Sequence, residues 1–385
     1  MALPVRRLRP PSSAPLLLTN YRGAGIGDFG AGLGDHLSSR IGSLRTEETE
    51  VNGEGFSRQS VLVATYPGPV IANIGLTAWG RSGFRNFSGF ASLGIHASTG
   101  HPTICIVHHA IEILDSKETG YPISGLVRWG AHTALRRLSR CDLVVFSPRL
   151  KDLLMRAYSA KSVWLVPLPG NQCRDPPTGP REAKPKVVTA GYWAPYKGID
   201  TYLDTVAQLG PVADFYMIGR PHRLLSQDSA FAANVERWKA RAEQLGVNLP
   251  GFLEPGVLDL LLSGQCTGVL PYTSVSGASA SFQMFAERGI PVVASDLPEF
   301  RYLEKCGAGV LLAPATAEGM SAAIGNVLKD SALWSQLVAK QVAFSQRYSW
   351  ESFTEELVTR YHLTGDQVPM STSVSREQGA RGPGP

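Results

Sequence analysis

The stretch from Pro271 to Phe300 constrains the fold of this 385-residue chain more than any other. It is typical of a buried strand (Cys266–Tyr272), a loop of small residues (Ser274–Ser281), a helix to about Arg288 and a second buried strand (Val292–Ser295). Two buried strands that are joined through a helix predict a parallel β–α–β unit. The chain is therefore expected to be an α/β protein.

The small residues of the loop leave the start of the predicted helix open to a ligand. They are Ser276, Gly277, Ala278 and Ser279. Unpaired backbone N–H groups at a helix start carry partial positive charge, which suits an anion such as phosphate. An ordinary strand–helix turn that needs small residues for packing is the alternative, and this element by itself leaves both interpretations open.

This stretch resembles the donor-binding loop of the retaining GT-B glycosyltransferases of family 4, which transfer a sugar from a nucleoside-diphosphate sugar. The family pattern is E-G-F-G-x-x-x-x-E-A-M-A-x-G-x-P-V-V-A-S, and Gly289–Ser295 (G-I-P-V-V-A-S) matches its end. Gly277 also matches, whereas Ser276 and Met284 replace two glutamates that hold the sugar and the ribose of the donor. The chain thus resembles a variant branch of the family. The resemblance implies that the donor contacts Tyr272, Ser276, Gly277, Ala278, Ser279 and Met284.

A second segment resembles the same family. A predicted strand, Lys186–Ala190, leads into Gly191–Asp200 (G-Y-W-A-P-Y-K-G-I-D) and an amphipathic helix to about Leu209. The segment is similar to the family pattern G-R-x-x-x-x-K-G-x-D, which implies that Lys197 contacts the donor diphosphate as a point charge. A solvated turn lysine is the alternative. Tyr192 occupies the position of the family's arginine, so half of the usual cationic pair is absent.

A further strand is predicted at Phe215–Gly219, and Arg220 follows it directly. Ligands of open α/β sheets bind at the carboxyl ends of the strands. Our hypothesis is that Arg220 supplies the charge that Tyr192 does not.

The N-terminal half begins with a short apolar strand, Leu16–Thr19, and a glycine-rich turn that opens a helix. Gly25, Gly27 and Gly30 match G-x-G-x-x-G, the fingerprint of dinucleotide-binding folds. A lone fingerprint is a weak signal. In family 4 the same turn lets the backbone approach donor and acceptor, and the resemblance implies this role for Gly25 and Gly27.

A NAD-dependent dehydrogenase is the alternative interpretation of these glycines, because Glu47, Glu48 and Glu50 follow about twenty residues later. These glutamates lie in a polar stretch, residues 46–55, that we do not predict to be a strand. Nothing in the C-terminal half resembles the substrate domain of a dehydrogenase. We therefore favour the glycosyltransferase interpretation.

Two long uncharged runs, Gln59–Gly80 and Asn86–Ile111, raise the question of a membrane span. Prolines, glycines and histidines interrupt both runs, so buried parallel strands fit them better. We predict strands at Val61–Thr65, Val70–Ile74 and Thr103–Val107, and no transmembrane segment.

His108 directly follows the last of these strands. Family 4 proteins often carry a histidine at this strand end, so the resemblance implies that His108 lies near the donor diphosphate or the acceptor hydroxyl. A polar residue that merely leaves the core is the alternative. No histidine pair has convincing metal-ligand spacing and no D-x-D motif is present, so we expect a metal-independent enzyme without a cofactor.

The remaining elements complete an alternation of strands and helices that favours two Rossmann-like domains with parallel sheets, the GT-B architecture. Predicted elements are Gly125–Leu138 (helix), Cys141–Ser147 (strand), Arg149–Ala157 (helix) and Ser162–Val166 (strand). We expect a flexible N-terminus (1–14), an acceptor domain (15–173), a linker (174–186), a donor domain (187–349), a closing helix that returns to the first domain (350–363) and a disordered tail (364–385).

Composition favours an intracellular enzyme. Five scattered cysteines form neither a disulfide nor a zinc pattern, and the apolar run after the N-terminal arginines is too short for a secretory signal. Residues 1–183 hold 20 lysines and arginines against 13 acidic residues, a net of +7, and the remainder holds 17 against 19, a net of −2. The basic half could face an anionic acceptor, the cytoplasmic face of a membrane or only solvent. No motif for nucleic acid accompanies it.

The sequence thus predicts a retaining, metal-independent glycosyltransferase that uses a UDP- or GDP-sugar and a glycan, lipid-linked or small-molecule acceptor. A GT-B protein that binds nucleotide or a partner glycosyltransferase without turnover is the first alternative, because of Tyr192, Ser276 and Met284. A NAD-dependent oxidoreductase is the second. The sequence itself names neither the sugar nor the acceptor.

Overall fold

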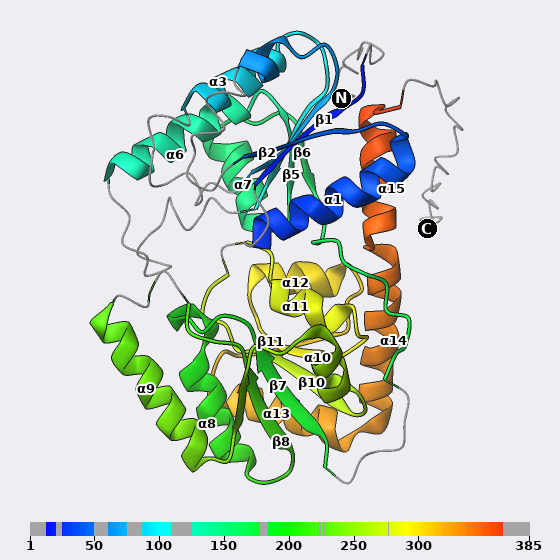
Figure 1. The fold of residues 1–385 in the computed structure, drawn as a ribbon. Coiled ribbons are helices and arrows are strands. Elements are labelled where there is room, and N and C mark those ends of the chain that lie inside the picture. Colours follow the sequence, from blue (N-terminus) through cyan, green and yellow to red (C-terminus); the bar gives the residue numbers. More distant parts are fainter. Residues whose placement is uncertain are drawn as a thin grey trace, which may run out of the picture.

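A computed structural model of the chain describes residues 13–20, 25–49, 61–74, 87–108, 125–177, 184–222, 225, 228–275 and 277–364. These residues form two α/β domains, each built on a six-stranded sheet (Figure 1). All strand pairs in both sheets are parallel. The carboxyl ends of the strands therefore lie along one edge of each sheet, where open α/β folds bind ligands.

The N-terminal sheet has the order β2-β1-β3-β4-β5-β6. Its strands are β1 (Leu16–Asn20), β2 (Arg45–Thr49), β3 (Val70–Ile74), β4 (Thr103–Val107), β5 (Asp142–Val145) and β6 (Val163–Leu165). The helices of this domain include α1 (Gly25–Ile41), α3 (Phe87–His96), α6 (Gly125–Leu138) and α7 (Pro148–Ala157). The predicted strands β3 and β4 and the predicted helix α6 are confirmed residue for residue.

The C-terminal sheet has the order β12-β11-β10-β7-β8-β9. Its strands are β7 (Lys186–Ala190), β8 (Asp214–Ile218), β9 (Asn248–Gly251), β10 (Cys266–Leu270), β11 (Val292–Ser295) and β12 (Val310–Ala313). The helices are α8 (Ile199–Leu209), α9 (Ser229–Gln244), α10 (Pro255–Leu262), α11 (Ala280–Ala286), α12 (Pro298–Lys305), α13 (Ala317–Lys329) and α14 (Ser331–Arg347).

The chain crosses between the domains twice, first around Gly170 and again at residues 348–350, and the two crossings contact each other. The Gly170 N–H donates to the Tyr348 carbonyl (3.3 Å), and the Trp350 N–H donates to the Gly170 carbonyl (2.9 Å). After the second crossing, α15 (Trp350–Tyr361) runs beside α1 of the N-terminal domain (Figure 1). Its Phe353 and Leu357 are buried in the core of that domain. The C-terminal helix therefore joins the two domains.

Two sequence predictions for the N-terminal domain are wrong. Residues 61–65 are helical, not a strand: Val61 is 72% exposed, only Val63 of the five is buried, and the Thr65 hydroxyl donates to the Val61 carbonyl (2.8 Å). Conversely, Glu47 and Glu48 do lie in a strand, β2, which pairs with β1 at the sheet edge. An edge strand keeps one side in solvent, so its sequence can be polar. Glu50 lies outside the described residues.

The apolar runs fill both faces of each sheet, as parallel strands covered by helices require. Cys105, Cys141, Cys173 and Cys266 are buried, Cys306 is half-buried, and none of these described cysteines forms a disulfide. No helix within the described part of the chain combines the length and the apolar character needed to cross a bilayer.

A buried histidine predicts how stability depends on pH. His96 is fully buried, and its ring nitrogens lie 2.8 Å from the Thr103 hydroxyl and 3.1 Å from the Tyr66 carbonyl. Burial, together with the nearby His101, holds the pKa of His96 below its ordinary value of 6.5. Protonation is therefore disfavoured in the folded state, and the stability that depends on neutral His96 is present above pH 6.5 and is lost as the pH falls through the folded-state pKa.

We expect the melting temperature of the wild type to fall between pH 7.5 and pH 5 more steeply than that of His96→Gln. The variant starts lower at pH 7.5 because glutamine fits the two partners poorly, but it has no imidazole to protonate. Differential scanning calorimetry across this range measures both slopes. Equal slopes would show that His96 does not govern the acid side of the stability curve.

Candidate functional site

Lys197 lies at the carboxyl edge of the C-terminal sheet, in the turn between β7 and α8. The turn is a short 3-10 segment, Pro195–Lys197, followed by Gly198 with a φ of +66°. A Cβ atom on Gly198 would come within 1.7 Å of the Pro271 carbonyl oxygen. Glycine at this position therefore lets the turn lie directly against the end of β10.

The ammonium group of Lys197 is held by aromatic residues. Its Nζ donates to the hydroxyl of Tyr272 and lies 4.1 Å from the centroid of the same ring and 5.4 Å from that of Tyr196. Tyr272 is 1% exposed, so its ring is fixed, and its hydroxyl lies 3.4 Å from Ser279 Oγ. Among the described residues no carboxylate forms an ion pair with Lys197. Its charge is therefore available to an anionic ligand.

Space beside this ammonium depends on Gly191. The residue has a φ of +113°, and a Cβ atom there would lie 2.6 Å from Ser281 Oγ and 3.8 Å from Lys197 Nζ. Ser281 in turn donates to the Ala190 carbonyl (2.7 Å) and so ties α11 to the end of β7. Glycine at position 191 thus lets the end of β7, the start of α11 and the lysine approach one another.

The start of α11 faces the other domain. Ser279 is its N-cap, and the Ser279 hydroxyl accepts the Phe282 N–H (3.1 Å). Gly277 and Ala278 precede it, and Ala278 packs against the apolar cluster of the N-terminal domain that includes Phe29. Ser276 lies outside the described residues. The loop predicted from sequence therefore lies where the two domains meet.

Met284 stands where the family pattern has a glutamate, but its side chain makes no comparable polar contact among the described residues. The residue is half-buried and packs against the apolar cluster around β10 and β11. Its carbonyl accepts a hydrogen bond from Arg288 Nη1 (2.9 Å). Any contact of Met284 with a donor would therefore be apolar.

Arg220 lies beside Tyr192, the residue at the position of the family's arginine. Its guanidinium carbon is 5.7 Å from the Tyr192 ring centroid and 4.8 Å from that of Phe252, and its Nη2 is 3.5 Å from the Tyr192 hydroxyl. The Trp193 N–H donates to the Arg220 carbonyl (2.8 Å), which joins the two loops. A positive charge is thus present next to position 192, on an exposed arginine.

The N-terminal domain contributes a buried polar chain at the carboxyl ends of β1, β3 and β4. His108 is 7% exposed, and its Nε2 donates to Asn73 Oδ1 (2.7 Å), while Asn73 Nδ2 donates to Thr19 Oγ1 (3.1 Å). The centroid of the His108 ring also lies 4.5 Å from that of Phe29, in an edge-on contact, and 5.2 Å from that of Phe146. Hydrogen bonds and rings from several elements therefore fix the orientation of this imidazole.

The glycine-rich turn lies next to these hydrogen-bonded residues. Gly25 and Gly27 are in the first turn of α1, directly after β1. A Cβ atom on Gly30 would lie 1.6 Å from Thr19 Oγ1 and 2.7 Å from Asn73 Nδ2. The third glycine of the fingerprint thus allows close packing of helix and strand, as it does in dinucleotide-binding folds.

Two contacts bring the domains together beside these groups. The Ser147 hydroxyl donates to Glu299 Oε1 (3.2 Å), with both residues buried, and Arg149 Nη1 lies 3.5 Å from the Val275 carbonyl. Ser147 follows β5 and caps α7, whereas Glu299 lies in the first turn of α12 after β11. The carboxyl edges of the two sheets therefore face each other. These residues were not predicted to belong to the site, although each follows a buried strand closely.

Removal of the Ser147 hydroxyl is expected to weaken both α7 and the domain contact. Ser147→Ala loses an N-cap, worth about 1 kcal/mol, and a hydrogen bond to a buried carboxylate, worth about 1.5–3 kcal/mol. Thr316→Ala removes the cap of α13, where Thr316 Oγ1 accepts the Gly319 N–H (3.1 Å), and a hydrogen bond to the exposed carboxylate of Glu318 in the same helix, but no contact between domains. Urea unfolding should show the larger loss for Ser147→Ala, and equal losses would rule out a stabilising domain contact.

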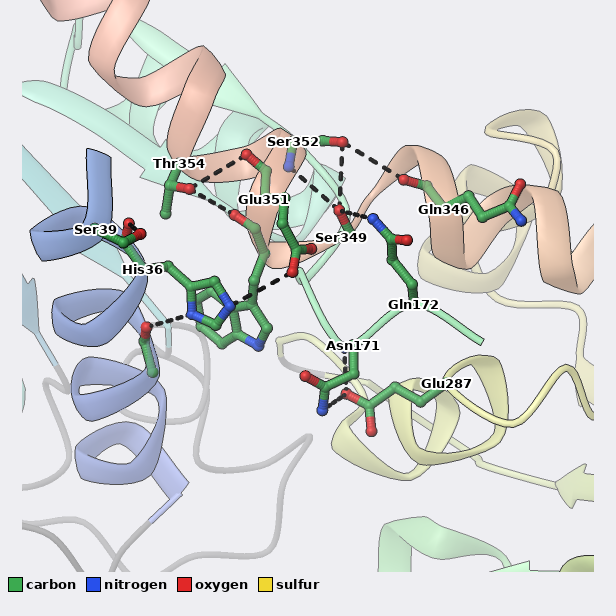
Figure 2. Close-up of polar contacts among 12 residues, drawn as sticks. His36, Ser39, Asn171, Gln172, Glu287, Gln346, Ser349, Glu351, Ser352 and Thr354 are labelled. Atoms are coloured by element: carbon green, nitrogen blue, oxygen red, sulfur yellow. Dashed lines mark hydrogen bonds and ion pairs between the residues drawn. The ribbon is translucent and has the colours of Figure 1, made fainter. Parts of the chain in front are cut away.

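Figure 2 shows how the first crossing is tied to the end of α11 and to the second crossing. Asn171 donates to Glu287 Oε1 from its backbone (2.9 Å), and Gln172 Nε2 donates to Ser349 Oγ (3.4 Å). Burial raises the pKa of Glu287 despite the hydrogen bonds that its carboxylate accepts from Asn171. Glu287 belongs to the cap of α11, so the crossing connects directly to the helix that Ser279 begins.

The sequence matches no family model and no curated protein. Solved structures match nearly the whole chain. Sucrose-phosphate synthase from Thermosynechococcus elongatus has a TM-score of 0.67 at 16% identity, over 91% of this chain and 98% of that one. HepE from Anabaena in complex with UDP has a TM-score of 0.67 at 14% identity, over 91% of this chain and 100% of that one. A glycosyltransferase from Rickettsia africae has a TM-score of 0.65 at 12% identity, over 90% of this chain and 97% of that one. The chain therefore has the two-domain GT-B fold, as the sequence predicted.

Proposed function

We propose that this protein is a glycosyltransferase that moves a sugar from a UDP- or GDP-sugar to an acceptor hydroxyl, with retention of configuration and without a metal ion. The observation that carries the proposal is the ammonium of Lys197, held by Tyr272 at the carboxyl edge of the C-terminal sheet. No carboxylate of the described residues neutralises it. The acceptor would be a glycan, a lipid-linked sugar or a small molecule.

Departure of a nucleoside diphosphate leaves negative charge on the β-phosphate. Preorganised donors at the place where charge develops usually contribute more to catalysis than any other single effect. Lys197 would supply a cation there; the Tyr272 hydroxyl accepts a hydrogen bond from it, and Ser279 Oγ lies 3.4 Å from that hydroxyl. Arg220 would add a second cation near Tyr192, where the family has an arginine. The complex of HepE with UDP supports a nucleotide as a ligand of this fold.

The acceptor would enter from the N-terminal domain. His108 lies at the carboxyl edge of that sheet with its Nε2 hydrogen used by Asn73, so we assign it to positioning the acceptor or the diphosphate. In our proposal the acceptor attacks from the side of the leaving group, and the phosphate takes the hydroxyl proton. Domain contacts such as Ser147 with Glu299 would exclude water and limit donor hydrolysis.

A nucleotide-binding protein without turnover is the second candidate. The observation that favours it is the packing of Met284 into the apolar core, because a polar contact with the donor is then absent at this position. Such a protein would bind a nucleoside diphosphate, or a partner glycosyltransferase, and release no sugar. The oxidoreductase remains the third candidate, since Glu47 and Glu48 lie in β2, which pairs with β1, the strand before the glycine-rich turn.

Melting temperatures measured with UDP, GDP, ADP, dTDP and NADH test the proposal. A ligand at one hundred times its dissociation constant adds about 2.7 kcal/mol to native stability. We expect selective stabilisation by UDP or GDP that is lost in Lys197→Ala. Stabilisation by NADH alone would favour the oxidoreductase. No shift with any nucleoside diphosphate would overturn the donor site.

A further inference from the structure

A pocket of about 360 Å³ lies where the two domain crossings meet, apart from the candidate site. Its walls come from β6 and the first crossing, from α12, from the end of α14 and from α15. None of the candidate-site residues described above lines it. The volume is at the lower end of the range for small-molecule pockets, about 300–1,000 Å³. The pocket therefore admits a ligand about the size of a disaccharide or smaller.

The walls of this hinge pocket are aromatic. Trp164 and Phe353 stack with their centroids 5.4 Å apart and their planes 13° apart, and Tyr302 and Tyr348 line the same space. Burial, together with the neighbouring Cys306, raises the pKa of both tyrosines, so both remain neutral phenols. Neutral phenols both donate and accept hydrogen bonds. Both hydroxyls also hydrogen-bond with the Cys306 thiol, and each phenol can form a further hydrogen bond with a ligand.

The two charged side chains that line the pocket have opposite signs. Arg347 and Glu356 line it with opposite signs, and Ser352 adds a hydroxyl. The Arg347 guanidinium carbon lies 5.4 Å from the Tyr348 centroid, and Glu356 forms an ion pair with Arg360 (2.5 Å). A phosphate would need an excess of cations, and a purely apolar ligand would leave the polar groups unpaired. A neutral molecule with apolar faces and many hydroxyl groups meets both conditions.

We propose that the hinge pocket binds a neutral saccharide at a site separate from the donor site. A pyranose ring presents C–H groups to the aromatic walls and hydroxyl groups to Arg347, Glu356 and the tyrosines. Both domains contribute to the walls, so the bound sugar contacts both of them. Through α12 the pocket also neighbours the candidate site, because Phe300 of the same helix lies 5.6 Å from Tyr272. The proposal stands independently of any nucleotide binding.

Saturation-transfer NMR and titration calorimetry with maltose, lactose and N-acetylglucosamine test the proposal on the full chain. We expect saturable binding of at least one sugar, weakened at least tenfold in the double variant Arg347→Ala/Glu356→Ala. That variant keeps the net charge and places alanine at helical or helix-end positions, so the fold should survive. Glu236→Ala/Lys239→Ala removes a matched exposed pair on α9 (2.8 Å) and should bind as the wild type does.

Two further variants distinguish loss of binding in the pocket from misfolding of the double variant and from binding at the donor site. Tyr302→Phe removes a single hydroxyl from the pocket and should weaken binding severalfold even if the double variant does not fold. Lys197→Ala should retain the saccharide signal, because the donor site is elsewhere. Absence of saturable binding by all three sugars would overturn the proposal. Unchanged affinity in the pocket variants, or displacement of the sugar by inorganic phosphate, would also overturn it.

Discussion

Replacement of Lys197 by alanine is expected to lower kcat/KM for sugar transfer about 10²–10³-fold, the usual effect of removing one preorganised donor from a developing charge. The expectation rests on the ammonium that Tyr272 holds, with no carboxylate of the described residues to neutralise it. The fold should be unaffected, since the contacts of this ammonium within the described part of the chain are with Tyr196 and Tyr272. Steady-state kinetics with the donor identified by the nucleotide titration measure the effect.

Three controls show whether the charge itself is responsible. Lys197→Arg keeps the charge and should recover part of the activity, although arginine has a different shape. Tyr272→Phe keeps the ring and removes the hydroxyl that accepts from Lys197, so its loss should be smaller than that of Lys197→Ala. Lys239→Ala removes an exposed lysine of α9 and should have no effect. Full activity of Lys197→Ala would remove the lysine from the mechanism.

The largest expected loss of stability comes from Gly198→Ala. Its φ of +66° disfavours any L-residue, and the added Cβ would meet the Pro271 carbonyl oxygen at 1.7 Å. A backbone carbonyl cannot move as a flexible side chain can, so the turn and the end of β10 must separate. We expect a loss of about 3 kcal/mol or more in the free energy of unfolding. Donor binding should weaken too, because Lys197 precedes this glycine.

Gly246→Ala is the matched control for the collision. Gly246 has a φ of +68°, and nothing lies within 4 Å of the position of its added Cβ. It therefore carries the backbone strain without the clash, and its loss should be about 1–2 kcal/mol. Urea unfolding of both variants gives the difference. Equal losses would mean that the contact between Gly198 and Pro271 is not tight in solution.

Most strands of the fold could be predicted because parallel strands are buried on both faces and appear as continuous apolar runs. Val70–Ile74 and Thr103–Val107 are examples. β2 was missed because an edge strand can be polar, and residues 61–65 were wrongly assigned because a short β-branched run also fits a helix with one buried face. Local sequence does not report which elements lie at the edge of a sheet.

The candidate site could be predicted only where its residues lie close together in sequence. Tyr272 and Ser279 are seven residues apart and lie in the same loop between β10 and α11. By contrast, 54 residues separate Thr19 from Asn73, and 152 separate Ser147 from Glu299. Such pairs are created by the fold and by the domain arrangement. A polar residue in or just after an apolar strand is the signal that a single sequence does contain.

Release of nucleotide from a sugar donor tests the central claim most directly, because it needs no acceptor. UDP-glucose, UDP-galactose, UDP-N-acetylglucosamine and GDP-mannose would each be incubated with the protein, with and without EDTA, and followed by NMR. The proposal predicts slow release from one donor, unchanged by EDTA, lost in Lys197→Ala, and with the first free sugar in the donor's anomeric configuration. Nucleotide binding without release from any donor would contradict the enzyme and favour the protein without turnover.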